Sequence, residues 1–315
     1  MKDIFYKLPK EFLERLIEIY PRHYNNILNT FLNKKLTTFR VNYLKTDLVN
    51  LKESLKRENI SYKELQFPKG AFILKETLNR LQATSIYNNG LIYVQNVSSM
   101  LPVILLEPKD GEKILDVCAA PGAKTTQIAS LAKNSEIVAI EKIRIRYYKL
   151  LANLKIQGAN NVKPYLLDGI FIRKKFPEYF DKILLDAPCS AEARFLIHDP
   201  HTYKYWRIKK ICEMVHKQKK LIQSAFFALK EGGILVYSTC TFSPEENEGI
   251  IDWFINKFKD KLEVLPIELN LSNVMSGLTS WEGKKFSKEC NLTKRIIPND
   301  FMEGFFIAKI RKITS

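Results

Sequence analysis

Hydrophobic and polar positions follow two different patterns along the chain, and the pattern changes near residue 113. The first part predicts two short helices within 1–35, because the apolar residues there fall on one helical face. A small α/β unit follows, in which Thr46 or Asp47 is a candidate helix N-cap. Its expected elements are a strand at 36–44, a helix at 46–60 and strands at 71–76 and 90–96.

From residue 113 onward, short apolar runs alternate with amphipathic stretches, which is typical of a parallel, doubly wound sheet. The runs are almost continuously apolar, as expected when helices cover both faces of a sheet. The predicted fold class is therefore α/β. We expect strands at 113–118, 136–141, 162–168, 181–186, 233–239 and 304–310, and helices at 123–132, 145–158, 206–230 and 246–258.

A proline, a glycine and mixed charges at 106–113 indicate a linker between two domains. We expect an N-terminal module at 1–108 and a larger domain at 109–315, which suits a chain of 315 residues with 46% hydrophobic content. No apolar run is long enough to predict a membrane span. The N-terminus shows no signal-peptide pattern, so we expect a cytoplasmic protein.

The formal net charge of +16 fits either a lysine-rich solvated surface or a polyanionic partner. The second interpretation is favoured, because basic charge supplies most non-specific affinity for nucleic acid. The five cysteines are odd in number and contain no C-x-x-C pair. This spacing argues against a disulfide framework and against structural zinc, and we expect no metal site.

The first strand of the regular region runs into the sequence DVCAAPGAKTT. A P-loop is excluded, since Ala123 separates Gly122 from Lys124 and Val117 stands at the first glycine position. The dinucleotide fingerprint G-x-G-x-x-G is also absent. The remaining interpretation is a nucleoside ligand without pyrophosphate, such as S-adenosylmethionine.

Acidic residues follow four strands of the predicted sheet, and the carboxyl ends of parallel strands form the usual ligand site. They are Asp116, Glu141, Asp168 and Asp186. Glu141 is a candidate for the ribose hydroxyls and Asp168 for an adenine edge, although strand-end acids are also common helix caps. Two basic residues nearby either face the methionine carboxylate or are solvated, namely Lys124 and Arg146.

Two cysteines, Cys189 and Cys240, stand where predicted strands meet this cleft. A thiolate that adds to carbon 6 of a cytosine makes carbon 5 nucleophilic toward a methyl donor, which is covalent catalysis. A carboxyl group such as Asp186 can supply the hydrogen bond that nitrogen 3 needs. The target base must be unstacked to reach such a pocket. The other cysteines predict no chemistry, and we expect Cys212 and Cys290 to be buried.

Three long motifs resemble those of RNA cytosine-5 methyltransferases of the RsmB/Nop/Sun type. DVCAAPGAKT is similar to D-x-C-A-A-P-G-G-K-T, DAPCSAEAR to D-A-P-C-S-G-x-G, and YSTCTFSPEENE to Y-S-T-C-S-x-x-x-x-E-N-E. The likeness extends over 36–310. It implies a Rossmann-like methyltransferase fold, preceded by a module similar to an RNA-recognition motif.

The same resemblance implies that Cys240 is the nucleophile and that Cys189 assists release of methylated RNA. The sequence by itself leaves open which cysteine attacks, since DNA cytosine methyltransferases use the cysteine of the P-C motif. The implied ligands of S-adenosylmethionine are Cys118, Ala119, Ala120, Pro121, Gly122, Ala123, Lys124, Glu141, Arg146, Asp168 and Asp186.

The chain departs from the family pattern where Ala123, Ala191 and Ala193 replace glycines. A positive φ at any of these positions would be strained without glycine. In the N-terminal module, Arg40 and Asn42 are candidate phosphate contacts, together with the lysine-rich helices.

The expected function is transfer of a methyl group to carbon 5 of a cytidine in structured RNA, with tRNA slightly favoured over rRNA. We expect a monomer. Two alternatives remain open: a non-catalytic RNA-binding factor on the same fold, and methylation of DNA.

Overall fold

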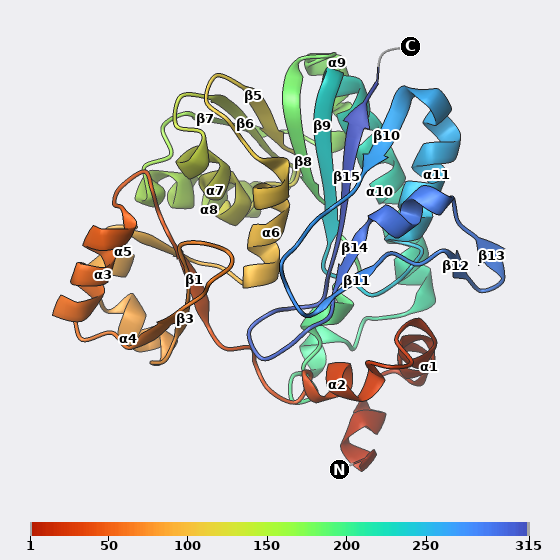
Figure 1. Ribbon diagram of the computed structural model, residues 1–315, viewed down its shortest axis with the longest axis horizontal. Coiled ribbons are helices and arrows are strands. Elements are labelled where there is room, and N and C mark those ends of the chain that lie inside the picture. The colour runs from red at the N-terminus through yellow and green to blue at the C-terminus, as the bar shows by residue number, and fades with distance from the viewer. Residues whose placement is uncertain (1, 314–315) are drawn as a thin grey trace.

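The computed structural model describes residues 2–313, and these contain two main sheets and a separate two-stranded hairpin (Figure 1). The smaller one has the strand order β2-β3-β1-β4, and all its pairs are antiparallel. Its chain order, β-α-β-β-α-β, is the ferredoxin-like arrangement. The elements are β1 (Thr38–Val41), α3 (Leu48–Arg57), β2 (Tyr62–Glu64), β3 (Ala71–Leu74), α4 (Leu78–Gln82), α5 (Ser85–Asn88) and β4 (Ile92–Val94).

The helix α3 covers the small sheet for reasons that are visible in the sequence. Asp47 caps it, as expected, by accepting a hydrogen bond from Asn50 N at 2.8 Å. Leu51 and Leu55 are fully buried in a cluster with Phe39 and Phe72 of the sheet. This cluster takes its buried residues from 39–92, so the small sheet has a hydrophobic core of its own.

The larger sheet has the order β11-β14-β15-β9-β8-β5-β6-β7, and β10 pairs with β15. The strands from β9 to β7 in this order are parallel, which confirms the predicted doubly wound arrangement. The strands are β5 (Lys113–Asp116), β6 (Glu136–Glu141), β7 (Val162–Leu166), β8 (Phe180–Asp186), β9 (Leu229–Thr239), β10 (Leu262–Leu265), β11 (Val274–Ser276), β14 (Lys294–Ile296) and β15 (Phe305–Lys312).

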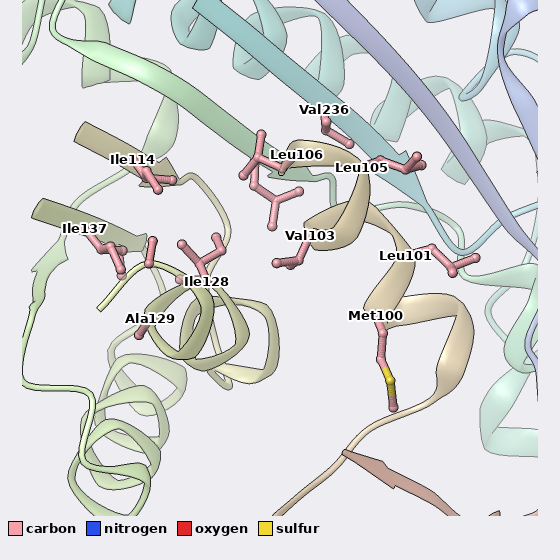
Figure 2. Close-up of a cluster of buried hydrophobic side chains, with 14 of the residues drawn as sticks. Met100, Leu101, Val103, Leu105, Leu106, Ile114, Ile128, Ala129, Ile137 and Val236 are labelled. Atoms are coloured by element: carbon pink, nitrogen blue, oxygen red, sulfur yellow. The ribbon is translucent and has the colours of Figure 1, made fainter. Parts of the chain in front are cut away.

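Helices cover both faces of the large sheet, and successive residues of each strand alternate between two cores. Ile114 packs with one group of helices, whereas the next residue, Leu115, packs with the other. The first group contains α6 (Val97–Leu106), α7 (Ala123–Leu131) and α8 (Arg144–Gln157). Figure 2 shows side chains of α6 and α7 meeting the sheet in this core. The second contains α9 (Ile172–Lys175), α10 (Ile208–Ala228) and α11 (Glu248–Phe258).

The first two α-helices pack against the large domain and lie apart from the small sheet (Figure 1). They are α1 (Lys10–Ile19) and α2 (Tyr24–Asn29). Phe12 of α1 contacts Phe195, with ring centroids 4.9 Å apart, and Tyr20 contacts Phe242 at 5.6 Å. These aromatic contacts brace the loops that follow β8 and β9.

Some elements were not predicted. Helix α6 is buried on nearly every side, so it shows no amphipathic period. The polar stretch at 271–300 contains β11, β14 and a small hairpin of β12 (Ser280–Trp281) and β13 (Lys284–Lys285). Short 3₁₀ helices complete the chain: η1 (Lys2–Lys7), η2 (Gly169–Phe171), η3 (Glu192–Arg194), η4 (Pro200–Thr202), η5 (Lys259–Lys261) and η6 (Lys288–Leu292).

Within residues 2–313, no helix is long and apolar enough to cross a membrane. The domain boundary between residues 108 and 109 stays a prediction. Helix α6, which precedes it, packs on the large sheet together with α7 and β9.

Candidate active site

A cavity of about 560 Å³ lies where the parallel strands of the large sheet end. Small-molecule sites usually have volumes between about 300 and 1,000 Å³. The structure brings the predicted site residues together here, because the loops after β5, β6, β7, β8 and β9 all reach the cavity. Gly122 is the one predicted residue that does not line it.

Gly122 instead makes the turn that carries the loop after β5 into α7. Its φ is +109°, and a Cβ at this position would lie 3.0 Å from Leu150 Cδ1. Glycine is therefore required for conformation and for space. Beneath the turn, Asp116 is buried and accepts a hydrogen bond from Thr125 Oγ1 at 2.7 Å. Burial raises the pKa of Asp116 to about 6, and we assign it a bracing role under the loop.

Glu141 is the last residue of β6, and only one of its two carboxylate oxygens accepts a hydrogen bond. Its Oε1 accepts from Ile143 N at 2.8 Å, whereas its buried Oε2 accepts no hydrogen bond. Arg146 Nη1 lies 3.4 Å from that second oxygen, and Arg146 also donates to the carbonyl of Ala120. A buried carboxylate oxygen without a donor is suited to a ligand hydroxyl.

Asp168 is a helix cap, as one of its two interpretations expected, and its contact with an adenine edge stays a prediction. Its Oδ1 caps η2 by accepting from Ile170 N at 3.2 Å, while Oδ2 pairs with Lys142 at 2.9 Å. The side chain also lines the cavity. A helix cap at a strand end is therefore compatible with a place at the ligand edge.

Lys124 is neither solvated nor free. Its Nζ lies 2.7 Å from Asp186 Oδ2 and donates to Ser99 Oγ at 2.6 Å. Asp186 Oδ1 accepts a further hydrogen bond from Ser238 Oγ at 2.8 Å. The ion pair is mostly buried, so Lys124 holds the carboxylate of Asp186 in one orientation at the cavity wall.

The two strand-end cysteines meet at the cavity, with their Sγ atoms 3.5 Å apart. Both side chains are half-buried. The pKa of the Cys240 thiol is lowered by its hydrogen bond with Cys189, in which either sulfur can be the donor, and by the nearby Arg194 guanidinium. The pKa of Cys189 is raised by the same contact and by burial. These directions make Cys240 the better candidate for the thiolate.

The other three cysteines differ in their surroundings. Burial raises the pKa of Cys118 and of Cys290, so neither is an activated thiol. Cys290 is buried, as expected. The expectation for Cys212 was wrong, because its side chain is exposed on α10 rather than packed in the core.

A hydrogen-bond network beneath the two cysteine loops was not predicted from the sequence. Ser190 Oγ lies 2.6 Å from Thr241 Oγ1, and Glu246 accepts from Ser190 N at 3.0 Å. Glu192 accepts from Thr241 Oγ1 at 2.7 Å. Both glutamates are buried, and burial raises the pKa of Glu246 to about 8. The network ties the loop after β8 to the loop after β9.

Only one of the three alanines that replace family glycines has a left-handed backbone. Ala191 has φ +58° and ψ +32°, so the expected strain is present there. Ala123 begins α7 and Ala193 lies in η3, and neither has a positive φ.

The expectation that Arg40 and Asn42 contact phosphate was wrong, because the structure buries both side chains. Arg40 is 5% exposed and Asn42 is fully buried. The Asn42 amide donates to the carbonyls of Gly90 and Gln157, at 2.8 and 2.9 Å. Both residues join the small sheet to the large domain.

Comparison with known proteins identifies the group to which the chain belongs. A family model described as 16S rRNA methyltransferase RsmB/F matches residues 103–311, and a model of its ferredoxin-like domain matches 8–80. The chain belongs to the RsmB/F family of RNA methyltransferases. This confirms the resemblance drawn from the three motifs.

Individual relatives cover nearly the whole chain. It is 37% identical over 316 aligned residues to a tRNA (cytosine(49)-C(5))-methyltransferase of Pyrococcus abyssi, covering 99% of this chain and 98% of that protein. It is 34% identical to ribosomal RNA small subunit methyltransferase F of Vibrio campbellii, covering 98% of this chain but only 64% of that protein. A methyltransferase homologue from Pyrococcus horikoshii has the same fold, with TM-score 0.86, 33% identity and coverage of 99% of this chain and 98% of that one.

The cofactor of the family is S-adenosylmethionine, and the cavity suits it. A solved structure of NSun6 from Pyrococcus horikoshii with SFG, an analogue of this cofactor, matches with TM-score 0.81 and 26% identity, covering 98% of this chain and 99% of that one. The open oxygen of Glu141 can accept from ribose hydroxyls, and the loop from Cys118 to Lys124 lines one wall. Among residues 2–313, no group of three or more His, Cys, Asp or Glu side chains could hold a metal ion.

Proposed function

We propose that this protein transfers a methyl group from S-adenosylmethionine to carbon 5 of a cytidine in structured RNA. The proposal depends mainly on one observation, that two contacting thiols line the same cavity as the loop after β5. When bound, the cofactor supplies a methyl group that a carbon nucleophile can take. The roles below describe what the chain's own residues do around an unstacked cytosine.

In this proposal Cys240 is the nucleophile. Its thiolate forms a bond to carbon 6 of the ring, and the displaced electron pair makes carbon 5 nucleophilic. The lowered pKa of Cys240 supports this assignment, since only the thiolate attacks. After carbon 5 has gained the methyl group it loses its proton to a base, and the sulfur–carbon bond breaks to restore the ring.

Asp186 is proposed to face nitrogen 3 of the ring. This nitrogen takes up a proton as the thiolate adds to carbon 6, and the carboxylate of Asp186 accepts a hydrogen bond from the resulting N–H. Asp186 lies at the end of β8, three residues before Cys189, and its carboxylate is fixed by Lys124 and Ser238. A side chain locked by two partners can position a base more precisely than a free one. Lys124 therefore contributes through Asp186 as well as through its place in the loop.

Cys189 is proposed to assist release of the methylated RNA. Its sulfur contacts that of Cys240, and its raised pKa keeps it protonated when Cys240 is ionised. A neutral thiol beside the sulfur–carbon bond can stabilise the departing thiolate by donating its S–H. Loss of this donor would slow the final step rather than the first.

We propose tRNA as the preferred substrate over rRNA. The relative named as a tRNA methyltransferase is covered over 98% of its length, whereas the chain spans about two thirds of the rRNA methyltransferase F. We further propose that residues 1–108 contribute RNA binding, that residues 109–315 carry the catalysis, and that the protein is a cytoplasmic monomer.

The test is incubation with radiolabelled S-adenosylmethionine and RNA transcribed without modifications. We expect the radiolabel to be incorporated into tRNA. After the tRNA is digested to nucleosides, the label should be found in 5-methylcytosine. DNA of the same sequence is the control for the alternative of DNA methylation. No incorporation into any RNA, while RNA is still bound, would favour the non-catalytic RNA-binding factor.

A further inference from the structure

Arg40 is a buried cation that crosses from the small sheet to the large domain. It lies in the middle of β1 and is 5% exposed. Its Nε donates to Gln95 Oε1 at 2.8 Å, and Gln95 lies in the short segment between β4 and α6. Its Nη2 donates to Ala123 O and Thr126 Oγ1, both at 2.9 Å, in the first turns of α7.

All these acceptors are neutral, which is unusual for a buried guanidinium. Among residues 2–313, no carboxylate forms an ion pair with Arg40, although Tyr93 lies under it at 5.3 Å. Burial lowers the pKa of Arg40 to about 9. A buried charge without a counter-ion costs free energy, and Arg40 is held here by hydrogen bonds to neutral groups, including Val41 O at 3.4 Å, and not by an opposite charge.

The helix that Arg40 contacts is itself positive at the same end. The N-cap of α7 is Gly122, which supplies no side-chain cap, and Ala123 and Lys124 line the cavity. Unsatisfied N–H groups and the helix dipole favour an anion at such a terminus. Lys124 is neutralised by Asp186, whereas Arg40 is not, so Arg40 adds uncompensated positive charge.

We propose that Arg40 is a positioning residue for the carboxylate of the cofactor's methionine moiety. It acts from behind the loop, through its hydrogen bond to Ala123 O and through the field that it adds at the N-terminus of α7. The small sheet thereby forms part of the cofactor site, to which β4 also contributes Tyr93 and Val94 as lining residues.

This inference rests on the cofactor and not on the cysteine chemistry of the proposed function. Its test therefore uses binding without RNA, so that a failure of either idea is seen separately. The dissociation constant is measured by calorimetry for two ligands, S-adenosylmethionine and decarboxylated S-adenosylmethionine. The two ligands differ only in the carboxylate.

We expect Arg40→Gln to weaken binding of S-adenosylmethionine by about 10-fold, as loss of one charge across a poorly solvated site allows. Binding of the decarboxylated ligand should change by less than about two-fold. Arg40→Lys keeps the charge, so it should retain most of the difference in dissociation constant between S-adenosylmethionine and the decarboxylated ligand. The matched control is Arg57→Gln, which removes one exposed charge from α3 of the same module.

An equal loss of affinity for both ligands would show that Arg40 only holds the two units together, and would overturn the proposal. Unchanged affinity for both ligands in Arg40→Gln would overturn it as well. Should Arg40→Gln fail to fold, Arg40→Lys decides alone: the proposal requires that any loss be confined to the ligand that carries the carboxylate.

Discussion

The loops that follow β8 and β9 are alike in position and differ in electrostatics. Each brings a half-buried cysteine to the same cavity, and the two sulfurs touch. The Cys240 thiol has a lowered pKa because of its hydrogen bond with Cys189 and the nearby Arg194, whereas the pKa of Cys189 is raised. A strand end therefore places a thiol, and the surroundings of each thiol set the direction of its pKa shift.

The largest effect should come from the loop after β9. Cys240→Ala removes the proposed nucleophile, so we expect turnover to fall by about 10³-fold or more in the methylation assay. Binding of S-adenosylmethionine should persist, because the loop after β5 is unchanged. Residual turnover near the wild-type rate would contradict the distinction between the two loops.

The corresponding change in the loop after β8 should have a different signature. Cys189→Ala leaves the attacking thiol in place, so we expect a covalent protein–RNA adduct to accumulate while turnover is lost. The adduct is measured on a denaturing gel with labelled RNA. The double variant with Cys240→Ala is the control. An adduct that needs Cys189 and survives loss of Cys240 would reverse the two roles.

Glu246, which is buried in the hydrogen-bond network beneath the two loops, predicts a pH dependence of stability. Burial raises the pKa of Glu246 from its ordinary 4.5 to about 8, so between these values the native protein keeps a proton that the unfolded chain releases. The contribution is full below pH 4.5 and is lost as the pH rises to about 8, which amounts to about 5 kcal/mol.

Glu246→Gln should flatten this dependence, as measured by urea unfolding at several pH values between 5 and 9. Glu263→Gln, at an exposed site on β10, is the matched control and should leave the pH dependence as it is. If the free energy of unfolding changed with pH equally in wild type and in Glu246→Gln, the prediction would be contradicted, because Glu246 would then be ionised over the whole pH range.

The smallest effect should come from the charge that distinguishes the loops. Arg194 is 56% exposed, so solvent screens part of its field. Arg194→Met should raise the pKa of Cys240 and lower its alkylation rate at pH 7 by about 10-fold or less, with recovery at pH 9. Alkylation is measured by mass spectrometry in a Cys189→Ala background, and Arg194→Lys should restore most of the rate. An unchanged pH profile would remove Arg194 from the explanation.

Much of the large domain could be predicted because its signals are local. Each parallel strand is a short apolar run, and the acid or cysteine at its end is only one to three residues beyond. Since parallel strands end at one edge, Glu141, Asp168 and Asp186 had to approach the same cavity. The motifs then supplied the identity of that cavity.

The remaining features depend on contacts that no local pattern records. Lys124 and Asp186 are 62 residues apart along the chain, and Arg40 meets Ala123 across 83 residues. A lysine or arginine that will be buried looks in the sequence like a solvated one. For this reason Arg40 was predicted to meet phosphate, although it donates hydrogen bonds to Ala123 and Thr126 in the first turn of α7.

The place of β15 in the sheet has a consequence for biosynthesis. This strand, Phe305–Lys312, pairs with β9, β10 and β14, and it is synthesised after all three of them. Until it emerges, β9 has an open edge beside the reactive cysteine, and the sheet is incomplete. The sheet that carries Cys240 therefore cannot be completed until synthesis has passed residue 312.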